Sequence, residues 1–501
     1  MKENDFLSIA ENMRDTGDFI SRKVYFFNAF EPDTQIKIFP QPPLISYQIL
    51  ASWNIIGRNL WGPRLINVLF GIISILAIYR IALLLFQDLI LALFCAFLLA
   101  IMPLAVFFSR NLQPESPAFF FMLVGNLFYL EFAYRHKKNY LILGGIAFFA
   151  AWLYKFSFIF GALPFLFLLP FKYMRKNKKA VFSYLAYFIL PYSFIILTII
   201  WLKLIGQWHF VPQLTLDRIK IFDLFSPAYW NLNWRIVWWY IQGENFTIVF
   251  TFLAICGVII ASLGRKEIVG RYIIGWAFTI VPYSMIFSDY INQHNYYQMP
   301  FLGMVCIASV YAVLKISKII GMNMPGYLIS LIIVLSAMPV CKSIYRMYAT
   351  NFWGVDVAGN SLKKLTLPGE RLFLSTHSQG LGIATYAQRY SGWPVDLADF
   401  KEKEAKFKIR YICIYPALYF QQLESNSPEI ARYIQDNYHP KELGLLGYHG
   451  RLEYLILEKG GTWDPKDYLE KDFGYAQLKT VYRLFGKRIP FYTVRLNGPN
   501  I

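Results

Sequence analysis

The chain has 501 residues, of which 56% are hydrophobic and only 16% are charged, and its mean hydropathy is +0.38. Soluble domains carry about 25% charged residues, and this composition excludes a disordered chain, a coiled coil, a collagen and a small disulfide scaffold. The net charge of +18 would suit nucleic-acid binding, but the basic residues cluster in short loops between apolar runs. We therefore expect a polytopic membrane protein and no nucleic-acid partner.

Residues 1–62 form the first segment that we predict. It begins with an amphipathic stretch that contains Phe6, Ile9, Ala10 and Met13, passes through a Pro-rich turn, and continues as a second amphipathic stretch over 44–60. Amphipathic segments of this kind lie on a membrane surface. We expect 1–62 to be an extracytoplasmic first loop with interfacial helices.

About ten apolar runs follow, and together they predict a membrane domain over 63–345. Each run is near the length needed to cross a hydrocarbon core of about 30 Å. Two of them are short. The runs are 65–86, 89–108, 117–134, 140–154, 157–171, 181–205, 246–264, 271–288, 297–316 and 326–345.

Alternate loops between these runs differ in charge. One set contains thirteen basic residues and a single acid, Glu267. By the positive-inside rule this set is cytoplasmic, which places 1–62, 109–116, 206–245, 289–296 and 346–501 outside. The protein is expected in a plasma membrane, most simply a bacterial inner membrane, with its polar segments on the extracytoplasmic side.

Residues 346–501 differ in composition from the rest of the chain. Strand-like runs at 371–375, 410–415 and 452–458 alternate with polar stretches, which predicts a small extracytoplasmic α/β domain. The five cysteines lie in apolar or strand-like runs without a CxxC motif, so we expect buried thiols and neither a disulfide framework nor a zinc site.

Several ionisable residues lie at the outer ends of the predicted spans. Cations beside carboxylates at a membrane surface suit a lipid-linked phosphate, because the cations hold the phosphate while a carboxylate takes a proton from an acceptor hydroxyl. The alternative for each residue is that it extends to the interface and anchors its helix. The candidates are Glu3, Asp5, Arg64, Arg110, Glu115, Lys155 and His294.

An ordered series of motifs over about 1–316 resembles the dolichyl-phosphate-mannose-protein mannosyltransferase-like family, which has the GT-C fold and includes aminoarabinose transferases of lipid A. Each motif is weak alone, but the order and the topology match together. The matching residues are Glu3, 9–13, Gly17-Asp18-Phe19, Gln41-Pro42-Pro43-Leu44, Pro63-Arg64-Leu65, Phe70-Gly71, Ser109-Arg110, Pro114-Glu115, Gly144-Gly145 with Lys155, and His294 with Tyr296, Tyr297 and Pro300.

The chain departs from the family pattern at its beginning. The Asp of the family's Asp-Glu pair falls on Lys2, and the spanning helix that precedes the pair in the family is missing. The residue before Pro-Pro-Leu is Gln41, where the family often has His or Lys, and the second-loop Asp is Glu115. A truncated or misassigned N-terminus would explain the first two departures together.

The resemblance implies an inverting transfer of a sugar, hexose or pentose, from a polyprenyl-phosphate donor to a hydroxyl of an extracytoplasmic lipid, protein or glycan in the cell envelope. It implies catalytic roles for Glu3, Asp5 and Glu115. Binding of the lipid phosphate and sugar would fall to Arg64, Arg110, Lys155, His294, Tyr297 and Gln41. Some family members use a divalent metal ion, for which Glu3, Asp5, Glu115 and His294 are the available ligands, although their spacing is no metal signature.

Two other functions remain open from the sequence. A transporter or flippase of lipid-linked sugars would also have ten spans and intramembrane charges, but it would place its polar motifs near the membrane midplane in paired repeats. An inactive relative that only binds a lipid-linked sugar would explain Lys2 at the expected position of the base.

Overall fold

The computed structural model describes residues 2–20, 23–24, 26–27, 30–31, 42, 44–204, 226–264, 267–321, 326–349, 352–376, 379–447, 449–464 and 476–496. The chain divides into two compact units. One comprises Phe39–Tyr348 and is called the helical unit below. The other joins Met1–Ile38 to Ala349–Ile501 and is called the sheet unit.

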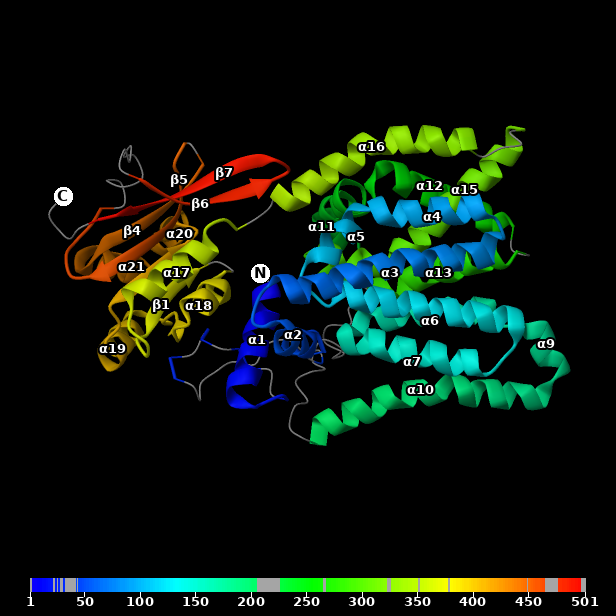
Figure 1. Ribbon diagram of the computed structural model, residues 1–501, viewed down its shortest axis with the longest axis horizontal. Coiled ribbons are helices and arrows are strands. Elements are labelled where there is room, and N and C mark those ends of the chain that lie inside the picture. The colour runs from blue at the N-terminus through cyan, green and yellow to red at the C-terminus, as the bar shows by residue number, and fades with distance from the viewer. Residues whose placement is uncertain are drawn as a thin grey trace. The chain divides into compact units, whose positions relative to one another are not determined.

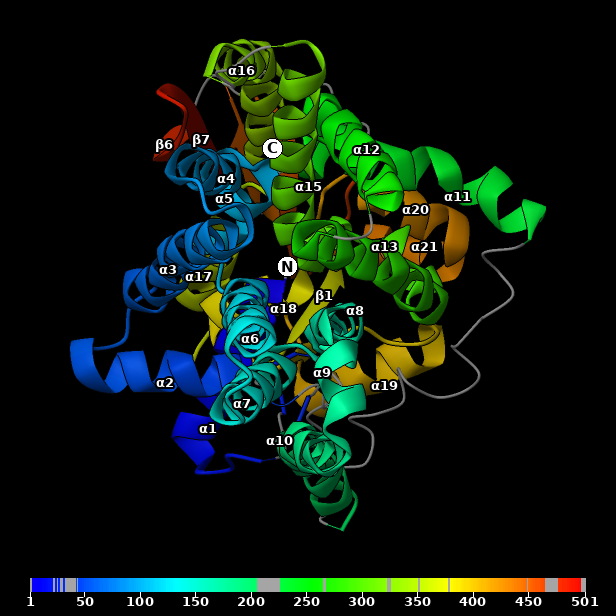
Figure 2. The same cartoon turned by 90° about the vertical axis from the view of Figure 1, so that its right-hand side faces the viewer.

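The helical unit is built from helices that run roughly parallel in Figure 1, several of which Figure 2 shows end-on. Its elements are α2 (Leu44–Ile56), α3 (Trp61–Phe86), α4 (Leu89–Ile101), α5 (Pro103–Arg110), α6 (Glu115–Arg135), α7 (Asn139–Tyr154), η2 (Phe156–Ala162), α8 (Phe165–Leu168), α9 (Phe171–Lys176), α10 (Lys178–Leu204), α11 (Pro227–Trp239), η7 (Tyr240–Asn245), α12 (Thr247–Leu263), α13 (Ile268–Ile286), α14 (Ser288–Ile291), η8 (Asn295–Phe301), α15 (Leu302–Ile319) and α16 (Gly326–Ala349).

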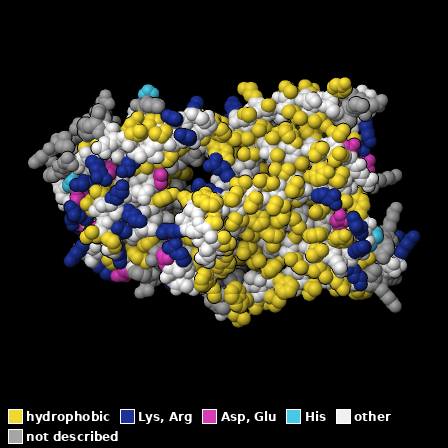
Figure 3. Space-filling model, viewed as in Figure 1, with side chains coloured by type: hydrophobic (Ala, Val, Ile, Leu, Met, Phe, Trp, Pro, Cys, Tyr) yellow, Lys and Arg dark blue, Asp and Glu magenta, His cyan; other side chains and the backbone are white. Residues whose placement is uncertain are grey.

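Within the described residues, five helices are long and apolar enough to cross a membrane, and there are seven spans if each of two bent pairs counts as one. Three shorter apolar segments lie at Leu44–Ile56, Asn139–Tyr154 and Phe156–Leu168. The face of the helical unit drawn in Figure 3 is broadly hydrophobic over its outer helices, as a lipid-facing surface requires. The chain is an integral membrane protein.

The two bent pairs have a local cause in the backbone. Met102 is extended and Pro103 occupies the first turn of α5, so the run predicted as 89–108 is two helices that meet at 60°. The second pair, Pro227–Asn245 with Thr247–Leu263, bends by 104°. Average hydrophobicity does not reveal such breaks, because each bent pair taken together is still apolar enough to cross a membrane.

The sheet unit is a mixed α/β domain to which the N-terminal helix belongs. Its elements are α1 (Lys2–Thr16), α17 (Val355–Leu365), β1 (Leu372–Thr376), α18 (Gly380–Ala387), β2 (Ser391–Gly392), α19 (Leu397–Phe407), β3 (Tyr411–Tyr415), α20 (Tyr419–Asn426), α21 (Pro428–Asn437), β4 (Tyr438–Leu446), β5 (Arg451–Lys459), β6 (Gln477–Leu484) and β7 (Lys487–Arg495).

Within the described residues, the strands form one sheet in the order β2-β1-β3-β5-β4-β7-β6. The β2-β1-β3 part is parallel and the remaining pairs are antiparallel. The predicted strands at 371–375, 410–415 and 452–458 correspond to β1, β3 and β5. The predicted fold class, a polytopic helical membrane protein with a C-terminal α/β domain, is thereby confirmed.

Helices cover both faces of this sheet (Figure 1). Alternate residues of β3 point to opposite faces: Ile412 and Ile414 pack with α19, α20 and α21, while Tyr411 and Cys413 pack with α17 and α18. A strand that is buried on both faces is hydrophobic throughout, as β3 is.

The segment after α1 extends the parallel edge of the sheet. Phe27 forms a parallel bridge with Ser391 of β2, and Ser391 donates its backbone N–H to the carbonyl of Phe26 at 2.8 Å. The ring of Phe30 stacks on Phe407 with centroids 5.3 Å apart and enters the core on that face. The sequence places 1–62 in one segment, whereas the structure divides the chain at Ile38.

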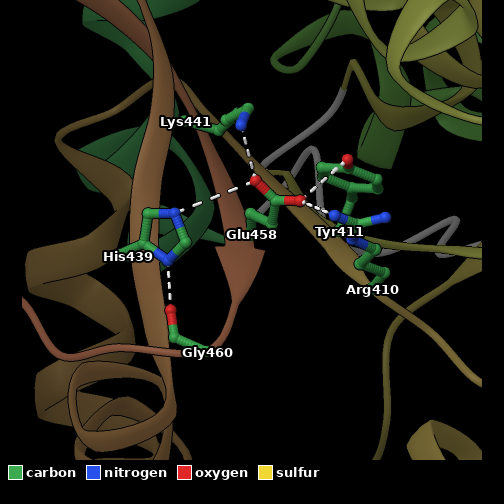
Figure 4. Close-up of polar contacts among 6 residues, drawn as sticks. All are labelled: Arg410, Tyr411, His439, Lys441, Glu458 and Gly460. Carbon is green, nitrogen blue, oxygen red and sulfur yellow. Dashed lines mark hydrogen bonds and ion pairs between the residues drawn. The ribbon is translucent and has the colours of Figure 1, made fainter. Parts of the chain in front are cut away.

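Figure 4 shows a polar cluster at one end of the strands β3, β4 and β5. The buried carboxylate of Glu458 accepts a hydrogen bond from the Tyr411 hydroxyl at 3.1 Å and pairs with Lys441 at 2.8 Å and with Arg410. His439 lies 3.8 Å from Glu458 through Nε2 and contacts the Gly460 carbonyl through Nδ1. These contacts neutralise a charge that burial would otherwise make unfavourable.

Candidate active site

A buried ion pair occupies the polar centre of the helical unit. Glu115 lies in the first turn of α6, and Lys155 is the extended residue between α7 and η2. Lys155 Nζ lies 2.5 Å from Glu115 Oε1, and the two side chains are only 4% and 1% exposed. The carboxylate at a helix N-terminus is stabilised further by the helix dipole.

Aromatic rings of η8 pack against the Lys155 side of this ion pair. Lys155 Nζ lies 4.0 Å from the ring centroid of Tyr296 and 4.6 Å from that of Tyr297. The imidazole of His294 stacks on Tyr296 with centroids 4.9 Å apart. The hydroxyl of Tyr283 donates to the carbonyl of Tyr297 at 2.5 Å and thereby helps to hold η8 in place.

Four of the predicted site residues, Glu115, Lys155, His294 and Tyr297, are thus brought together from α6, the α7–η2 junction and η8. Glu115 Oε2 is buried and accepts no hydrogen bond from the described part of the chain. A buried carboxylate oxygen without a donor is unfavourable in a resting protein. The arrangement can therefore accept one hydrogen-bond donor, such as a hydroxyl group, beside a fixed cation.

A hydrogen-bond network that the sequence did not predict holds the loop before Glu115. Asn67 is fully buried in α3, and its Nδ2 donates to the carbonyls of Asn111 at 2.5 Å and Gln113 at 2.9 Å. Its Oδ1 accepts from Gln48 of α2 at 2.8 Å. Ser116 Oγ donates to the backbone carbonyl of Asn67 at 3.0 Å. The sequence does contain a feature that could have identified Asn67, which is a carboxamide inside the apolar run 65–86. Burying such a side chain costs free energy unless it forms hydrogen bonds.

A cavity of about 140 Å³ lies between α3, α4, α5 and α6, next to this loop. Its walls are mostly apolar, and the polar side chains among them are those of Ser74, Ser109 and Ser116. Gly71 allows α3 and α5 to approach closely, because a Cβ there would lie 2.6 Å from the Cβ of Ser109. The cavity borders the residue that follows Glu115, and its lining suits a hydrocarbon segment.

The two predicted arginines lie on the same unit as the ion pair. Arg110 ends α5, is exposed, and places its guanidinium 4.8 Å from the ring centroid of Tyr348. Arg64 is half-buried in the first turn of α3, one helical turn before Asn67. Arg64 thus lies at the start of α3 and Arg110 at the end of α5.

The remaining predicted residues do not belong to the described part of the helical unit. Glu3 and Asp5 are on α1 and so belong to the sheet unit, where Asp5 is buried and Glu3 is half-buried. Gln41 lies outside the described residues. Among the residues that the structure describes, no group of three or more His, Cys, Asp or Glu side chains could hold a metal ion.

Comparisons with known proteins agree with this architecture. Residues 40–201 match the model of the dolichyl-phosphate-mannose-protein mannosyltransferase family. A sequence comparison with curated proteins finds no match.

Solved structures with a similar fold include an archaeal oligosaccharyltransferase and ArnT. The archaeal oligosaccharyltransferase AglB from Archaeoglobus fulgidus, in complex with an inhibitory peptide and a dolichol-phosphate, is 12% identical with a TM-score of 0.52 over 90% of this chain and 70% of its own. ArnT from Cupriavidus metallidurans is 12% identical in the apo state, with a TM-score of 0.51 over 91% and 92%. ArnT bound to undecaprenyl phosphate is 14% identical, with a TM-score of 0.50 over 91% and 93%. The resemblance to the GT-C mannosyltransferase-like family is confirmed.

Proposed function

We propose that the chain is a membrane glycosyltransferase that moves a sugar from a polyprenyl-phosphate donor to a hydroxyl of an extracytoplasmic lipid, protein or glycan. The observation that carries the proposal is the buried Glu115–Lys155 pair, whose Glu115 Oε2 lacks a hydrogen-bond donor within the described residues. A hydroxyl that approaches Oε2 would find both a proton acceptor and a nearby cation.

In the proposed reaction the acceptor oxygen forms a bond to the anomeric carbon while the bond between that carbon and the donor phosphate breaks. The electron pair of the broken bond stays on the lipid phosphate, and the hydroxyl proton passes to a carboxylate. We assign the proton acceptor to Glu115, with Glu3 and Asp5 of α1 as further candidates.

Cations that stabilise the leaving phosphate lower the barrier because charge develops there in the transition state. We assign this role to Lys155, Arg64 and Arg110, with His294 and Tyr297 shaping the pocket around Lys155. Similar structures bound to dolichol-phosphate or undecaprenyl phosphate support a polyprenyl phosphate as the lipid. The apolar cavity between α3 and α6 supports it as well, because it suits part of a prenyl chain.

The site would face the extracytoplasmic side, with 63–345 in the membrane and 1–62 and 346–501 outside. The charge difference between alternate loops supports this orientation.

The test uses the purified full chain in nanodiscs with a panel of polyprenyl-phosphate sugars and acceptors, and follows free polyprenyl phosphate by mass spectrometry. We expect release by the wild type and loss of release in Glu115→Gln. Glu131→Gln is the matched control, because Glu131 lies toward the other end of the same helix and pairs with Arg135.

Two results would contradict the proposed activity, and a third would contradict the role of Glu115. Donor binding without release across the panel would identify an inactive binding relative. Movement of intact donor between leaflets, without cleavage, would identify a transporter. Full release by Glu115→Gln would leave the pair with a purely structural role.

A further inference from the structure

The segment that joins α11 to α12 contains two costly backbone features. η7 is a turn of π-helix, in which Phe246 donates its backbone N–H to the carbonyl of Ile241, five residues earlier, at 3.0 Å. Thr247 follows with φ of +66°, a conformation that a β-branched residue rarely adopts. Such features persist where the surrounding structure fixes them, and π-helical turns are frequent at functional sites. A plain link between two helices would need neither feature.

The π-helical turn brings two polar side chains against η8. Asn245 is fully buried, and its Nδ2 donates to the backbone carbonyl of Asn295 at 3.1 Å and to Gln298 Oε1 at 2.7 Å. Glu244 Oε2 accepts a hydrogen bond from Asn295 Nδ2 at 2.9 Å. Neighbouring residues of η7 thus hold both the main chain and the side chains of η8.

The stretch of chain that η7 holds also carries the aromatic rings near Lys155. Tyr296 lies between the two anchored residues of η8, and its ring centroid is 4.0 Å from Lys155 Nζ. His294 stacks on Tyr296 and follows Gln293, whose carbonyl accepts a hydrogen bond from the Tyr240 hydroxyl at 3.2 Å. Anchors from η7 therefore flank both rings along the chain.

The contacts of Asn245 are not those of the most stable packing. Its Oδ1 is buried and accepts no hydrogen bond within the described part of the chain. Burial of an amide oxygen without a donor costs free energy. Departures of this kind from the most stable arrangement are typical of functional sites, where a side chain serves to place its neighbours.

We propose that Asn245 and Glu244 are positioning residues of the proposed active site, which hold η8 so that the ammonium group of Lys155 stays in place for the lipid phosphate. The inference rests on the proposed function, because that function assigns Lys155 to the phosphate. Neither positioning residue needs to touch the ligand. Loss of the two donors at 245, or of the acceptor at 244, would let η8 shift, and with it the rings that contact the cation.

The test measures binding of undecaprenyl phosphate to the full chain in nanodiscs, because this probe carries the phosphate and needs no turnover. Asn245→Leu keeps the size of the side chain and adds no charge, and we expect it to weaken binding by about tenfold. Ser309→Ala is the control, since Ser309 donates to the carbonyl of Phe250 and so bonds α12 instead of η8. Both variants should lower the melting temperature, but only Asn245→Leu should lower the affinity of the folded protein.

A second pair of variants separates the hydrogen bond of Glu244 from its charge. Glu244→Gln keeps an oxygen that can accept from Asn295 Nδ2, so it should bind the probe as the wild type does, whereas Glu244→Ala should bind it more weakly. Glu244 is half-buried, so this pair decides the question even if Asn245→Leu does not fold.

Two results would overturn the inference while the wild type still binds the probe. In the first, Asn245→Leu and Glu244→Ala bind no more weakly than Ser309→Ala, which would show that η7 only supports the fold. In the second, Glu244→Gln loses as much affinity as Glu244→Ala, which would show that the charge of Glu244 acts on the ligand directly. Failure of the proposed function is a different result, in which the wild type does not bind undecaprenyl phosphate, and the inference then fails with it.

Discussion

At the scale of single residues, the Glu115–Lys155 pair can be separated into a structural and a chemical role. Removing one partner of a buried pair leaves an uncompensated charge and costs about 3–5 kcal/mol, whereas replacing both by neutral groups costs much less. We therefore expect Glu115→Gln and Lys155→Met each to lower the thermal stability of the purified protein, and the double variant to recover most of it.

Activity should follow a different pattern from stability in these variants. All three should lack transfer, because each lacks the carboxylate, the cation or both. A double variant that regained both stability and transfer would show that the pair only supports the fold. Thermal unfolding in detergent and release of polyprenyl phosphate provide the two measurements.

A second residue, Glu458, links the stability of the sheet unit to pH. Burial alone would raise the pKa of Glu458, but the hydrogen bonds from Lys441 and Tyr411 and the charge of Arg410 lower it below the ordinary value of 4.5. A carboxyl whose pKa is lower in the folded state stabilises the fold above its unfolded pKa. That contribution is lost as the pH falls through the folded value.

Hydrogen exchange of the β5 amides should therefore accelerate as the pH falls below about 4.5, beyond the intrinsic pH dependence of exchange. In Glu458→Gln, exchange should be faster at neutral pH and should depend less on pH. Glu402→Gln, an exposed carboxylate on α19, is the control and should behave as the wild type. Equal pH dependence in all three proteins would contradict the assignment.

The sequence predicted the charged members of the site better than the residues that hold them. Glu115, Lys155 and His294 stood out because ionisable groups at span ends are costly and few. Asn67 and Gln48 did not stand out, because a carboxamide within an amphipathic or apolar run has many structural explanations. Only the fold shows that Asn67 reaches the carbonyls of Asn111 and Gln113, which lie more than forty positions later.

At the scale of elements, the loop between α5 and α6 depends on Asn67. Because Asn67 ties two carbonyls of this loop to α3, Asn67→Leu should displace the loop and the start of α6 that carries Glu115. We expect kcat for transfer to fall by roughly tenfold or more, since small misplacements of a reacting group are costly, while KM for the donor changes little. Asn126→Leu, also on α6, is a comparison that should change kcat less, because Asn126 donates to Met122 of its own helix and accepts from Tyr272 of α13 but does not bond the loop.

Close helix packing gives a second prediction at this scale. A Cβ at Gly257 of α12 would lie 2.1 Å from the carbonyl oxygen of Ala308 on α15, so the backbones could not stay in place. Small residues at such crossings allow close approach in membrane proteins. Gly257→Ala should lower the melting temperature in detergent, whereas Gly326→Ala, where a Cβ would meet no atom of the described residues within 4 Å, should not. A tolerated alanine at 257 would show that α12 and α15 are not in close contact.

The structure of the sheet explains why the sequence predicted some strands and missed others. The strands β1, β3 and β5 each contain an unbroken apolar run, at 372–374, 411–415 and 454–457, and were predicted, whereas β4 contains Pro440 and Gly444, and β7 contains Pro490. These residues interrupt the pattern that identifies a strand. Register irregularities in β4 fall at the same places, between 440 and 442 and after Gly444.

At the scale of the whole molecule, the two ends of the chain fold together. Segment 1–38 belongs to the sheet unit, with α1 against α18 and the Phe27 bridge on β2. The predicted carboxylates Glu3 and Asp5 are therefore positioned by the sheet unit and not by the first apolar run. No local pattern could reveal this, because the partners Phe27 and Ser391 are 364 positions apart in the sequence.

Phe30 provides the test of this arrangement. Its ring packs between Phe373 of β1 and Phe407 of α19 and is 9% exposed, so Phe30→Ala should cost about 3–5 kcal/mol within the sheet unit. Limited proteolysis of the full chain should then cut faster within 349–501 than in the wild type. Phe19→Ala, in the same segment but 51% exposed, should not change the cleavage rate. If the Phe30 variant were cut no faster than the Phe19 variant, the N-terminal segment would not contribute to the stability of the sheet unit.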